Sequence, residues 1–132
     1  MAQLVETCPH FVARDGEGRY LGHCHVRKGQ HPPFVERGVP EVADLNVMPD
    51  SRRRRAATAL LEAAEAHIAS TSPEAGIGVG LYDDYGPAQR LYSSRGYVLD
   101  GTGAWAGPRQ VRGGDVVTAD DDLVLYLTKR VR

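Results

Sequence analysis

The sequence is poor in cysteine and in aromatic residues, and it lacks any long apolar run. Cys8 and Cys24 are its only cysteines, so a disulfide-rich miniprotein is excluded. No apolar stretch approaches the roughly 18 residues that a membrane-spanning helix needs, and we expect no membrane partner. The first ten residues have neither the basic flank nor the apolar core of a signal peptide. These absences predict a cytoplasmic protein with two reduced thiols.

The chain also lacks an excess of either charge. Its 16 Lys and Arg residues and 17 Asp and Glu residues give a net charge of −1, which provides no global attraction to nucleic acid. Lysine is rare beside arginine, and Ala, Gly and Val are abundant, a bias that suggests a high-GC bacterial genome. With 42% apolar and 25% charged residues, the 132 residues have the composition and length of one globular domain, which we place at 1–132.

Local patterns predict alternating strands and helices. Apolar residues at helical spacing predict a helix across Ala57–Ile68, which Pro49–Ser51 would separate from the preceding strand and cap. Pro87 suits the first turn of a second helix, and Gly96 suits its C-terminal end. Strands are expected at 10–14, 19–27, 39–48, 76–82, 97–99 and 122–129. This order predicts an α/β or α+β fold around one mixed sheet.

Two segments between these elements have no regular pattern. The prolines and glycines of Lys28–Pro40 favour a loop, and the glycine-rich Gly101–Asp121 fits no single structure. The strand at 39–48 alternates regularly, so its side chains should divide between two faces. One face would carry Glu41, Ala43, Leu45 and Val47, and the other face would carry Val42, Asp44 and Asn46.

The most informative segment is Leu45–Leu61, where a strand, a short loop and four consecutive arginines lead into a helix. Cations at a helix N-terminus oppose the macrodipole, so this cluster is best explained by an anion that binds there. Free backbone N–H groups at that end form an anion site, which predicts phosphate binding. A solvated basic face is the plain alternative. Nucleic-acid binding is disfavoured, because Arg52 to Arg55 would fan out by about 100° per residue.

The second informative segment is Tyr82–Tyr97, which places a tyrosine shortly before a helix-ending glycine. Tyr92 lies four residues after Ala88, on the same helix face, and four residues before Gly96. For such a tyrosine taken alone, a core aromatic with a solvated hydroxyl is the more frequent interpretation.

Together these segments resemble the GCN5-related N-acetyltransferase (GNAT) superfamily. The family's strand-loop-helix motif, V-x-P-x-x-(Q/R)-x-x-G-x-(G/A), corresponds to Val47, Pro49, Arg52, Arg55 in place of glycine, and Ala57. The later motif, A-x-x-L-Y-x-x-x-G-(F/Y), is complete as Ala88, Leu91, Tyr92, Gly96 and Tyr97. The resemblance covers residues 39–97 and extends to the last strand. Two linked motifs at the proper separation are more specific than either alone.

The resemblance implies a fold and a cofactor. The fold would be a mixed, mostly antiparallel sheet flanked by helices, and the cosubstrate would be acetyl-CoA. The pantetheine arm would lie along the backbone of Asn46 and Val47. The pyrophosphate would bind backbone N–H groups of a turn formed by Arg52, Arg53, Arg54, Arg55, Ala56 and Ala57.

The resemblance also implies catalytic roles. Tyr92 matches the tyrosine that often protonates the leaving thiolate, and Glu41 matches a strand glutamate that serves as general base in some members. Asp44 is a weaker candidate for the base. We therefore expect acetyl transfer to a primary amine of a small molecule or peptide, by direct attack, because no Cys or Ser occupies a nucleophile motif. A homodimer is compatible with this interpretation.

The chain departs from the family pattern in two places. Arg55 would either crowd the phosphates or contact the 3′-phosphate. The family also has a further strand and helices before the first hairpin, so we expect an N-terminally shortened GNAT-like domain. The alternative function is therefore a non-catalytic module that binds CoA or a protein partner.

The remaining candidate sites are weaker. His23 and His25 flank Cys24 on a predicted strand, where Cys24 would point away from both, so we expect no metal site. Asp120–Asp122 could attract a cation or an amine, although a solvated turn explains it as well. Trp105 would either pack near the acceptor or cap the sheet. His31 has no partner that the sequence identifies.

Overall fold

The computed structural model describes residues 8–49 and 53–132, and only the backbone of Arg53 and Arg54. In chain order its elements are β1 (His10–Arg14), β2 (Tyr20–Lys28), α1 (Pro32–Arg37), β3 (Pro40–Val47), α2 (Arg53–Ala69), β4 (Glu74–Gly80), η1 (Asp83–Tyr85), α3 (Gly86–Ser94), β5 (Val98–Leu99), β6 (Trp105–Ala106), β7 (Arg109–Gln110) and β8 (Leu123–Arg130).

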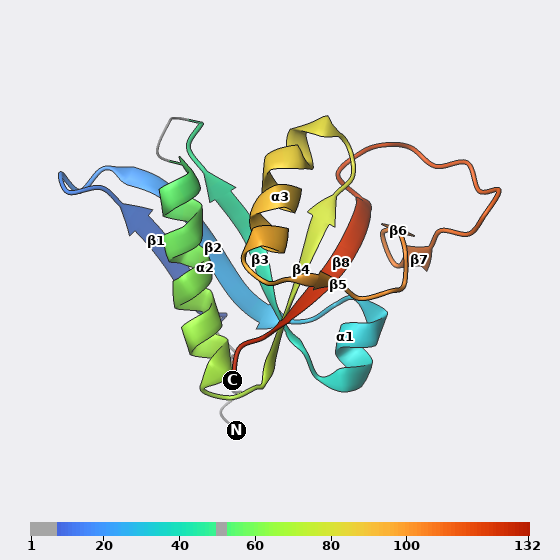
Figure 1. The fold of residues 1–132 in the computed structure, drawn as a ribbon, viewed down its shortest axis with the longest axis horizontal. Coiled ribbons are helices and arrows are strands. Elements are labelled where there is room, and N and C mark those ends of the chain that lie inside the picture. The colour runs from blue at the N-terminus through green and yellow to red at the C-terminus, as the bar shows by residue number, and fades with distance from the viewer. Residues whose placement is uncertain (1–7, 50–52) are drawn as a thin grey trace, which may run out of the picture.

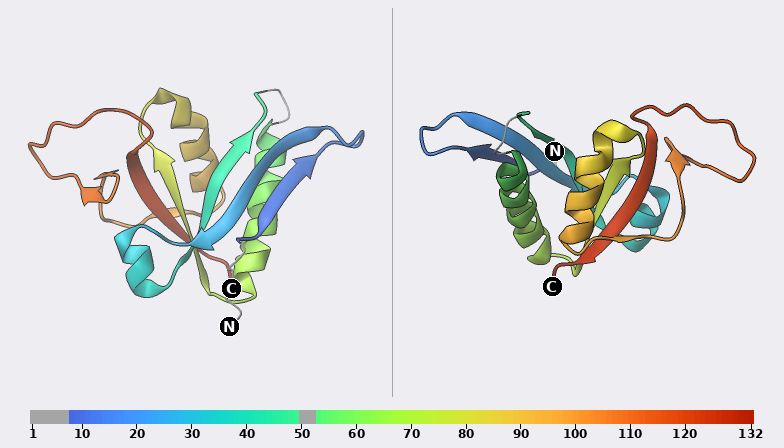
Figure 2. Two further views of the ribbon diagram at one scale, coloured as in Figure 1. Left: turned by 180° about the vertical axis from the view of Figure 1, so that it is seen from behind. Right: turned by 45° about the horizontal axis from the view of Figure 1, so that its top comes forward.

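The strands form one sheet in the order β1-β2-β3-β4-β8-β6-β7, and β5 also pairs with β8. Neighbouring strands are antiparallel except β3 and β4, which are parallel. The helices α2 and α3 lie on the same side of this sheet (Figure 1), and the view from behind places the strands in front of them (Figure 2). The mixed, mostly antiparallel sheet with flanking helices is therefore confirmed.

The face covered by α2 and α3, here called the helix face, carries the main apolar core. Helix α2 packs across β1, β2 and β3, and α3 packs on β4. Each buried aliphatic side chain contributes about 1.5–3 kcal/mol to folding. The core includes Cys24, Val26, Val42, Leu60, Leu61, Ala64, Ile68, Ile77, Val79, Tyr92 and Leu127.

The opposite face, here called the second face, is unusual because β4 places glycines at each of its positions on that face after Glu74. Ala75, Ile77 and Val79 point to the helix face, so Gly76 and Gly78 leave the other side of the strand bare. The Phe34 ring from α1 fills the space over Gly76, where an added Cβ would lie 2.6 Å from Cζ. Helix α1 thus covers part of the second face.

Helix α1 lies inside the segment predicted as a loop, and that prediction is wrong for residues 32–37. Pro32 and Pro33 occupy the first turn, where a missing N–H is no disadvantage. Gly38 ends the helix with φ of 68°, and its N–H bonds to the carbonyl of Val35. The residues that suggested a loop are therefore the start and stop signals of a very short helix.

The strand β3 contains a bulge that changes which side chains share a face. His25 pairs with Ala43, whereas His23 pairs with Asn46, so β3 has one extra residue in this stretch. Asp44 lies at the bulge and has φ of 53°. Leu45 and Val47 pack against the core on the helix face, as Val42 does. The predicted grouping of Leu45 and Val47 with Glu41 is wrong, because it assumed unbroken alternation.

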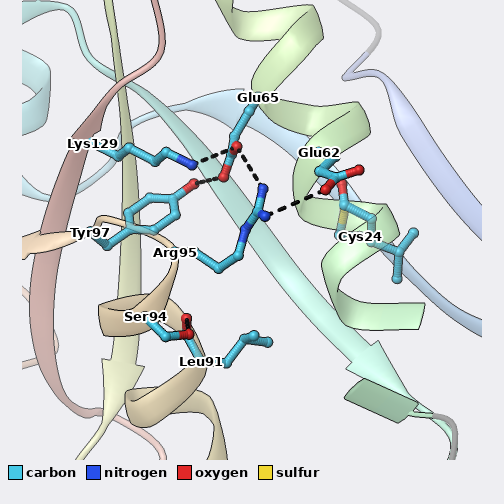
Figure 3. A network of polar contacts seen from close by, with 9 residues as sticks. Cys24, Glu62, Glu65, Leu91, Ser94, Arg95, Tyr97 and Lys129 are labelled. Atoms are coloured by element: carbon cyan, nitrogen blue, oxygen red, sulfur yellow. Dashed lines mark hydrogen bonds and ion pairs between the residues drawn. The ribbon is translucent and has the colours of Figure 1, made fainter. Parts of the chain in front are cut away.

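A buried carboxylate ties α2 to the C-terminal end of α3 and to β8 (Figure 3). Glu65 on α2 accepts hydrogen bonds from the Tyr97 hydroxyl at 3.0 Å and from Lys129 Nζ at 2.8 Å. Arg95 also reaches Glu65, at 3.4 Å, and contacts the exposed Glu62 at the same distance. Burial and the neighbouring Glu65 carboxylate raise the pKa of Tyr97, so this tyrosine acts as a neutral donor.

Candidate active site

The strands β3 and β4 pair over only two residues and then diverge. Glu41 pairs with Gly76 and Val42 with Ile77, and no further pairing between these strands occurs in the described residues. Beyond that point β3 continues to Val47 beside β2, while β4 continues to Gly80 beside β8. Figure 1 shows the two arrows separating, with α3 between them in this view. The sheet is thus open along part of its centre.

Glu41 lies on the second face, at the start of the divergence. Its side chain is 7% exposed, and one oxygen accepts a hydrogen bond from Arg27 Nη2 at 3.0 Å. Arg27 is its register partner on β2, so the ion pair follows directly from strand pairing. The other carboxylate oxygen has no hydrogen-bond partner among the described residues. It is not one of their fully buried polar atoms that lack a partner. That oxygen therefore keeps some exposed surface and an unused acceptor position.

Tyr92 lies on the helix face, on α3. The residue is 5% exposed and belongs to the main core, so the interpretation as a core aromatic is correct for its ring. Its hydroxyl has no hydrogen-bond partner in the described part of the chain, and this oxygen is not fully buried. Burial, with smaller contributions from Cys24 and Tyr85, raises the pKa of Tyr92 to about 12. The hydroxyl is therefore a protonated donor that keeps some exposed surface.

Cys24 lies in the core of the helix face, away from its neighbours on β2. Its side chain is fully buried, with Sγ 3.8 Å from the Leu60 carbonyl oxygen. Burial raises the pKa of this thiol to about 11. His23 instead contacts the Tyr20 hydroxyl, and His25 Nδ1 lies 3.4 Å from Asp44. Residues 8–49 and 53–132 contain no group of three or more His, Cys, Asp or Glu that could hold a metal ion.

The start of α2 is the predicted phosphate site. Arg52 lies outside the described residues, as do Asp50 and Ser51, the predicted helix cap. The helix begins at Arg53, and the Arg55 side chain is exposed. Ala56 and Ala57 are 4% and 6% exposed. Small side chains thus set the first turns of α2 close against the sheet while Arg55 faces solvent.

The predicted pantetheine strand runs beside the divergence. Asn46 is exposed and its side-chain amide donates to the Asp44 carbonyl at 3.1 Å, whereas Val47 is half-buried. Gly22 on β2 pairs with Val47, and a Cβ at Gly22 would lie 2.8 Å from Val47 Cγ1. Sequence reasoning missed the importance of Gly22, although a glycine inside a strand often marks such a close approach.

Sequence reasoning also missed a buried ion pair between His31 and Asp100. His31 Nε2 lies 2.8 Å from Asp100, and the His31 ring stacks on Tyr126. Trp105, which is 8% exposed, contacts the edge of that ring, so it packs inside the second face. The residues in each of these contacts are far apart in sequence. Trp105 also has a local contact, since its Nε1 donates a hydrogen bond to the Thr102 hydroxyl. The sequence therefore offers no signal for them.

Comparisons with known proteins agree on one family. The model of the acetyltransferase (GNAT) family matches residues 2–97. No curated protein sequence matches the chain. Within the described residues, no helix has the length and apolar character that crossing a membrane requires.

Three solved structures illustrate the likeness in fold. Aminoglycoside 6′-acetyltransferase type Ii is 16% identical, with a TM-score of 0.63 over 93% of this chain and 68% of its own. Nourseothricin acetyltransferase is 22% identical, with a TM-score of 0.68 over 93% and 65%. Naa20 of Chaetomium thermophilum, solved with a bisubstrate analogue, is 18% identical, with a TM-score of 0.63 over 90% and 64%.

The chain therefore spans about two thirds of the length of these structures. Their identities to it are all low, so they show the fold, whereas the family match covers most of the chain and shows the family. On this evidence, the chain belongs to the acetyltransferase (GNAT) family, the acetyl-CoA-dependent N-acetyltransferases.

Proposed function

We propose that this protein transfers an acetyl group from acetyl-CoA to a primary amine of a small molecule or peptide by direct attack. The observation that carries the proposal is the divergence of β3 and β4, with an accessible Tyr92 hydroxyl on one face and an accessible Glu41 oxygen on the other. A thioester placed between the strands would meet both groups. Positioning the two reactants in this way supplies much of the rate of such a reaction.

The donor would bind on the side of α2. Backbone N–H groups of the turn Arg52–Ala57 would hold the pyrophosphate, since a helix N-terminus favours anions. The pantetheine arm would run along the backbone at Asn46 and Val47, which β4 leaves unpaired. The exposed Arg55 would contact a phosphate rather than crowd it, because its side chain points to solvent. The cation run and the helix start then have a single explanation.

The chemistry divides between the two faces. Glu41 would accept a proton from the ammonium group of the acceptor, and the resulting neutral amine would attack the thioester carbonyl carbon. The carbon–nitrogen bond would form as the carbon–sulfur bond breaks, and the departing thiolate would gain, through solvent, the second proton that the nitrogen loses. The pKa of Tyr92, about 12, is above the ordinary thiol value of about 8.5. Tyr92 would therefore stabilise the departing thiolate chiefly by donating a hydrogen bond. An acyl-enzyme on Cys24 is disfavoured, because this buried thiol has a raised pKa and little thiolate.

Calorimetry with acetyl-CoA tests the donor site, and thiol release with an amine panel tests turnover. The panel comprises kanamycin, spermidine and a tetrapeptide with a free N-terminus. The exposed Cys8 would react with a thiol-detecting dye, so both assays use the Cys8→Ser variant. We expect binding and turnover of at least one amine. Binding without turnover would support the non-catalytic module that binds CoA. The absence of acetyl-CoA binding would contradict the proposed transfer and would leave only a module that binds a protein partner.

The role of Arg55 is tested in the same titration. Arg55→Ala should weaken acetyl-CoA binding by about fivefold, the usual upper range for an exposed ion pair. Dephospho-CoA, which lacks the 3′-phosphate, should bind equally well to both proteins if that phosphate is the partner of Arg55. Tighter binding of acetyl-CoA by Arg55→Ala would show instead that the arginine obstructs the site.

A further inference from the structure

The second face contains a tyrosine that spans the strand β4. Tyr126 on β8 is the register partner of Gly78 on β4. A Cβ built on Gly78 would lie 3.0 Å from Tyr126 Cε1 and 3.3 Å from Cδ1. The ring therefore leans across the bare glycine, from β8 toward β3. Gly78 follows directly on the last pair between β3 and β4, so Tyr126 extends toward the point where those strands diverge.

The plane of the Tyr126 ring is fixed by a buried histidine. The His31 ring lies 3.7 Å from it with an angle of 8° between the planes. His31 Nε2 is 2.8 Å from Asp100, and both side chains are at most 4% exposed. Asp100 in turn accepts hydrogen bonds from the backbone N–H and the hydroxyl of Thr102. Phe34 and Trp105 hold the His31 ring by edge contacts.

The histidine itself is closed to substrate. Its side chain is 0% exposed, and its Nδ1 is fully buried and has no hydrogen-bond partner in the described residues. The Tyr126 hydroxyl differs from it: this hydroxyl has no hydrogen bond within the described part of the chain, and it is not fully buried. Of the stacked pair, only Tyr126 can therefore contact a ligand.

The buried pair of His31 and Asp100 fills space at a cost in folding free energy. Burying an ionisable pair costs desolvation free energy that a well-packed apolar side chain would avoid. Gly78 gives up a side chain at the same place, which also lowers strand propensity. These costs are understandable if the orientation of the Tyr126 hydroxyl matters for binding.

We propose that Tyr126 is an acceptor-binding residue, whose hydroxyl oxygen accepts a hydrogen bond from the ammonium group of the amine beside Glu41. His31, held by Asp100, is then a positioning residue that acts through the Tyr126 ring. The inference rests on the proposed function, since it names the acceptor side of that same site. A neutral phenol is required for this role, and burial together with Glu41 raises the pKa of Tyr126.

The test is a comparison of steady-state constants for the best amine of the panel named above. Tyr126→Phe should raise the KM for the amine about tenfold, the effect of losing one hydrogen bond to a charged group. Its affinity for acetyl-CoA should stay unchanged, because the donor binds on the helix face. Tyr97→Phe is the matched control, since it removes a tyrosine hydroxyl on the helix face and should leave that KM within twofold.

Two further variants separate positioning from simple structure. His31→Gln retains a donor for Asp100 but removes the stacked ring, so the KM for the amine should rise with little change in acetyl-CoA affinity. Combined with Tyr126→Phe, it should raise the KM no further, because the hydroxyl it positions is already absent. If these variants fold poorly, Gly78→Ala provides the same test. Its added Cβ pushes against the Tyr126 ring and should raise the KM for the amine.

The possible outcomes are distinct. An unchanged KM in Tyr126→Phe, with normal turnover by the parent protein, overturns this inference and leaves the proposed function intact. Additive effects of His31→Gln and Tyr126→Phe overturn the positioning role of His31. If the parent protein turns over none of the three amines, the proposed function fails first and the inference fails with it.

Discussion

The carboxylate of Glu41 and the hydroxyl of Tyr92 belong to opposite faces of one sheet. Glu41 pairs with Arg27 on the second face, whereas Tyr92 extends from α3 into the core of the helix face. A continuous sheet would keep the two groups apart. In the proposed complex they meet a common molecule where β3 and β4 diverge, just beyond Val42 and Ile77. The parting of these two strands is thus the structural condition for the proposed chemistry.

Tyr92→Phe should lower kcat by about 100-fold, the lower range for removing a hydrogen-bond donor that stabilises negative charge in the transition state. The ring stays in the core, and the hydroxyl has no hydrogen-bond partner among the described residues, so stability should change little. Acetyl-CoA affinity should be unchanged in calorimetry. A variant with the turnover rate of the parent would show that Tyr92 serves only as a core aromatic.

Gly76→Ala should destabilise the protein by about 1–3 kcal/mol, the range for overpacking a buried site. The added Cβ would lie 2.6 Å from Cζ of Phe34, a side chain with no exposed surface. Gly16→Ala is the control, because a Cβ there meets nothing within 4 Å. Urea unfolding of both variants measures the difference. Equal stability of the two would mean that the Phe34 ring moves freely.

Glu65→Gln should cost about 1–3 kcal/mol, because the amide can no longer accept from Tyr97, Lys129 and Arg95 as a carboxylate does. Glu62→Gln removes a carboxylate from the same Arg95, but its side chain is 61% exposed, so less than about 1 kcal/mol should be lost. Urea midpoints compare the two. A larger loss in the Glu62 variant would contradict the placement of Glu65 at the centre of the network in Figure 3.

The two thiols should differ in reactivity. Cys8 is exposed, whereas Cys24 is buried with its pKa raised to about 11. Because the thiolate is the reactive form, iodoacetamide at pH 8 should alkylate Cys8 and leave Cys24 unmodified until denaturant is added. Mass spectrometry of the peptides provides the measurement. Rapid alkylation of Cys24 in the native protein would indicate that β2 and α2 separate readily.

Much of the fold could be predicted because its signals are local. The helical spacing before Ile68 placed α2, and short strand-forming runs placed β1 and β8 within one residue of their observed bounds. Gly96 has φ of 96°, as expected for a residue that ends a helix. Helix α1 escaped prediction, since six residues between prolines and a glycine provide too short a pattern to recognise.

The sequence by itself determined the family, because two motifs carry enough local chemistry to identify it, and it named Tyr92 and Glu41 as candidates. Only the tertiary structure decided the faces on which they act. A single bulge at Asp44 reverses the alternation of β3, which no count of residues reveals. His31 and Asp100 are 69 residues apart in sequence and meet at 2.8 Å. Such contacts depend on how the strands and α1 pack, and packing is a property of the whole chain.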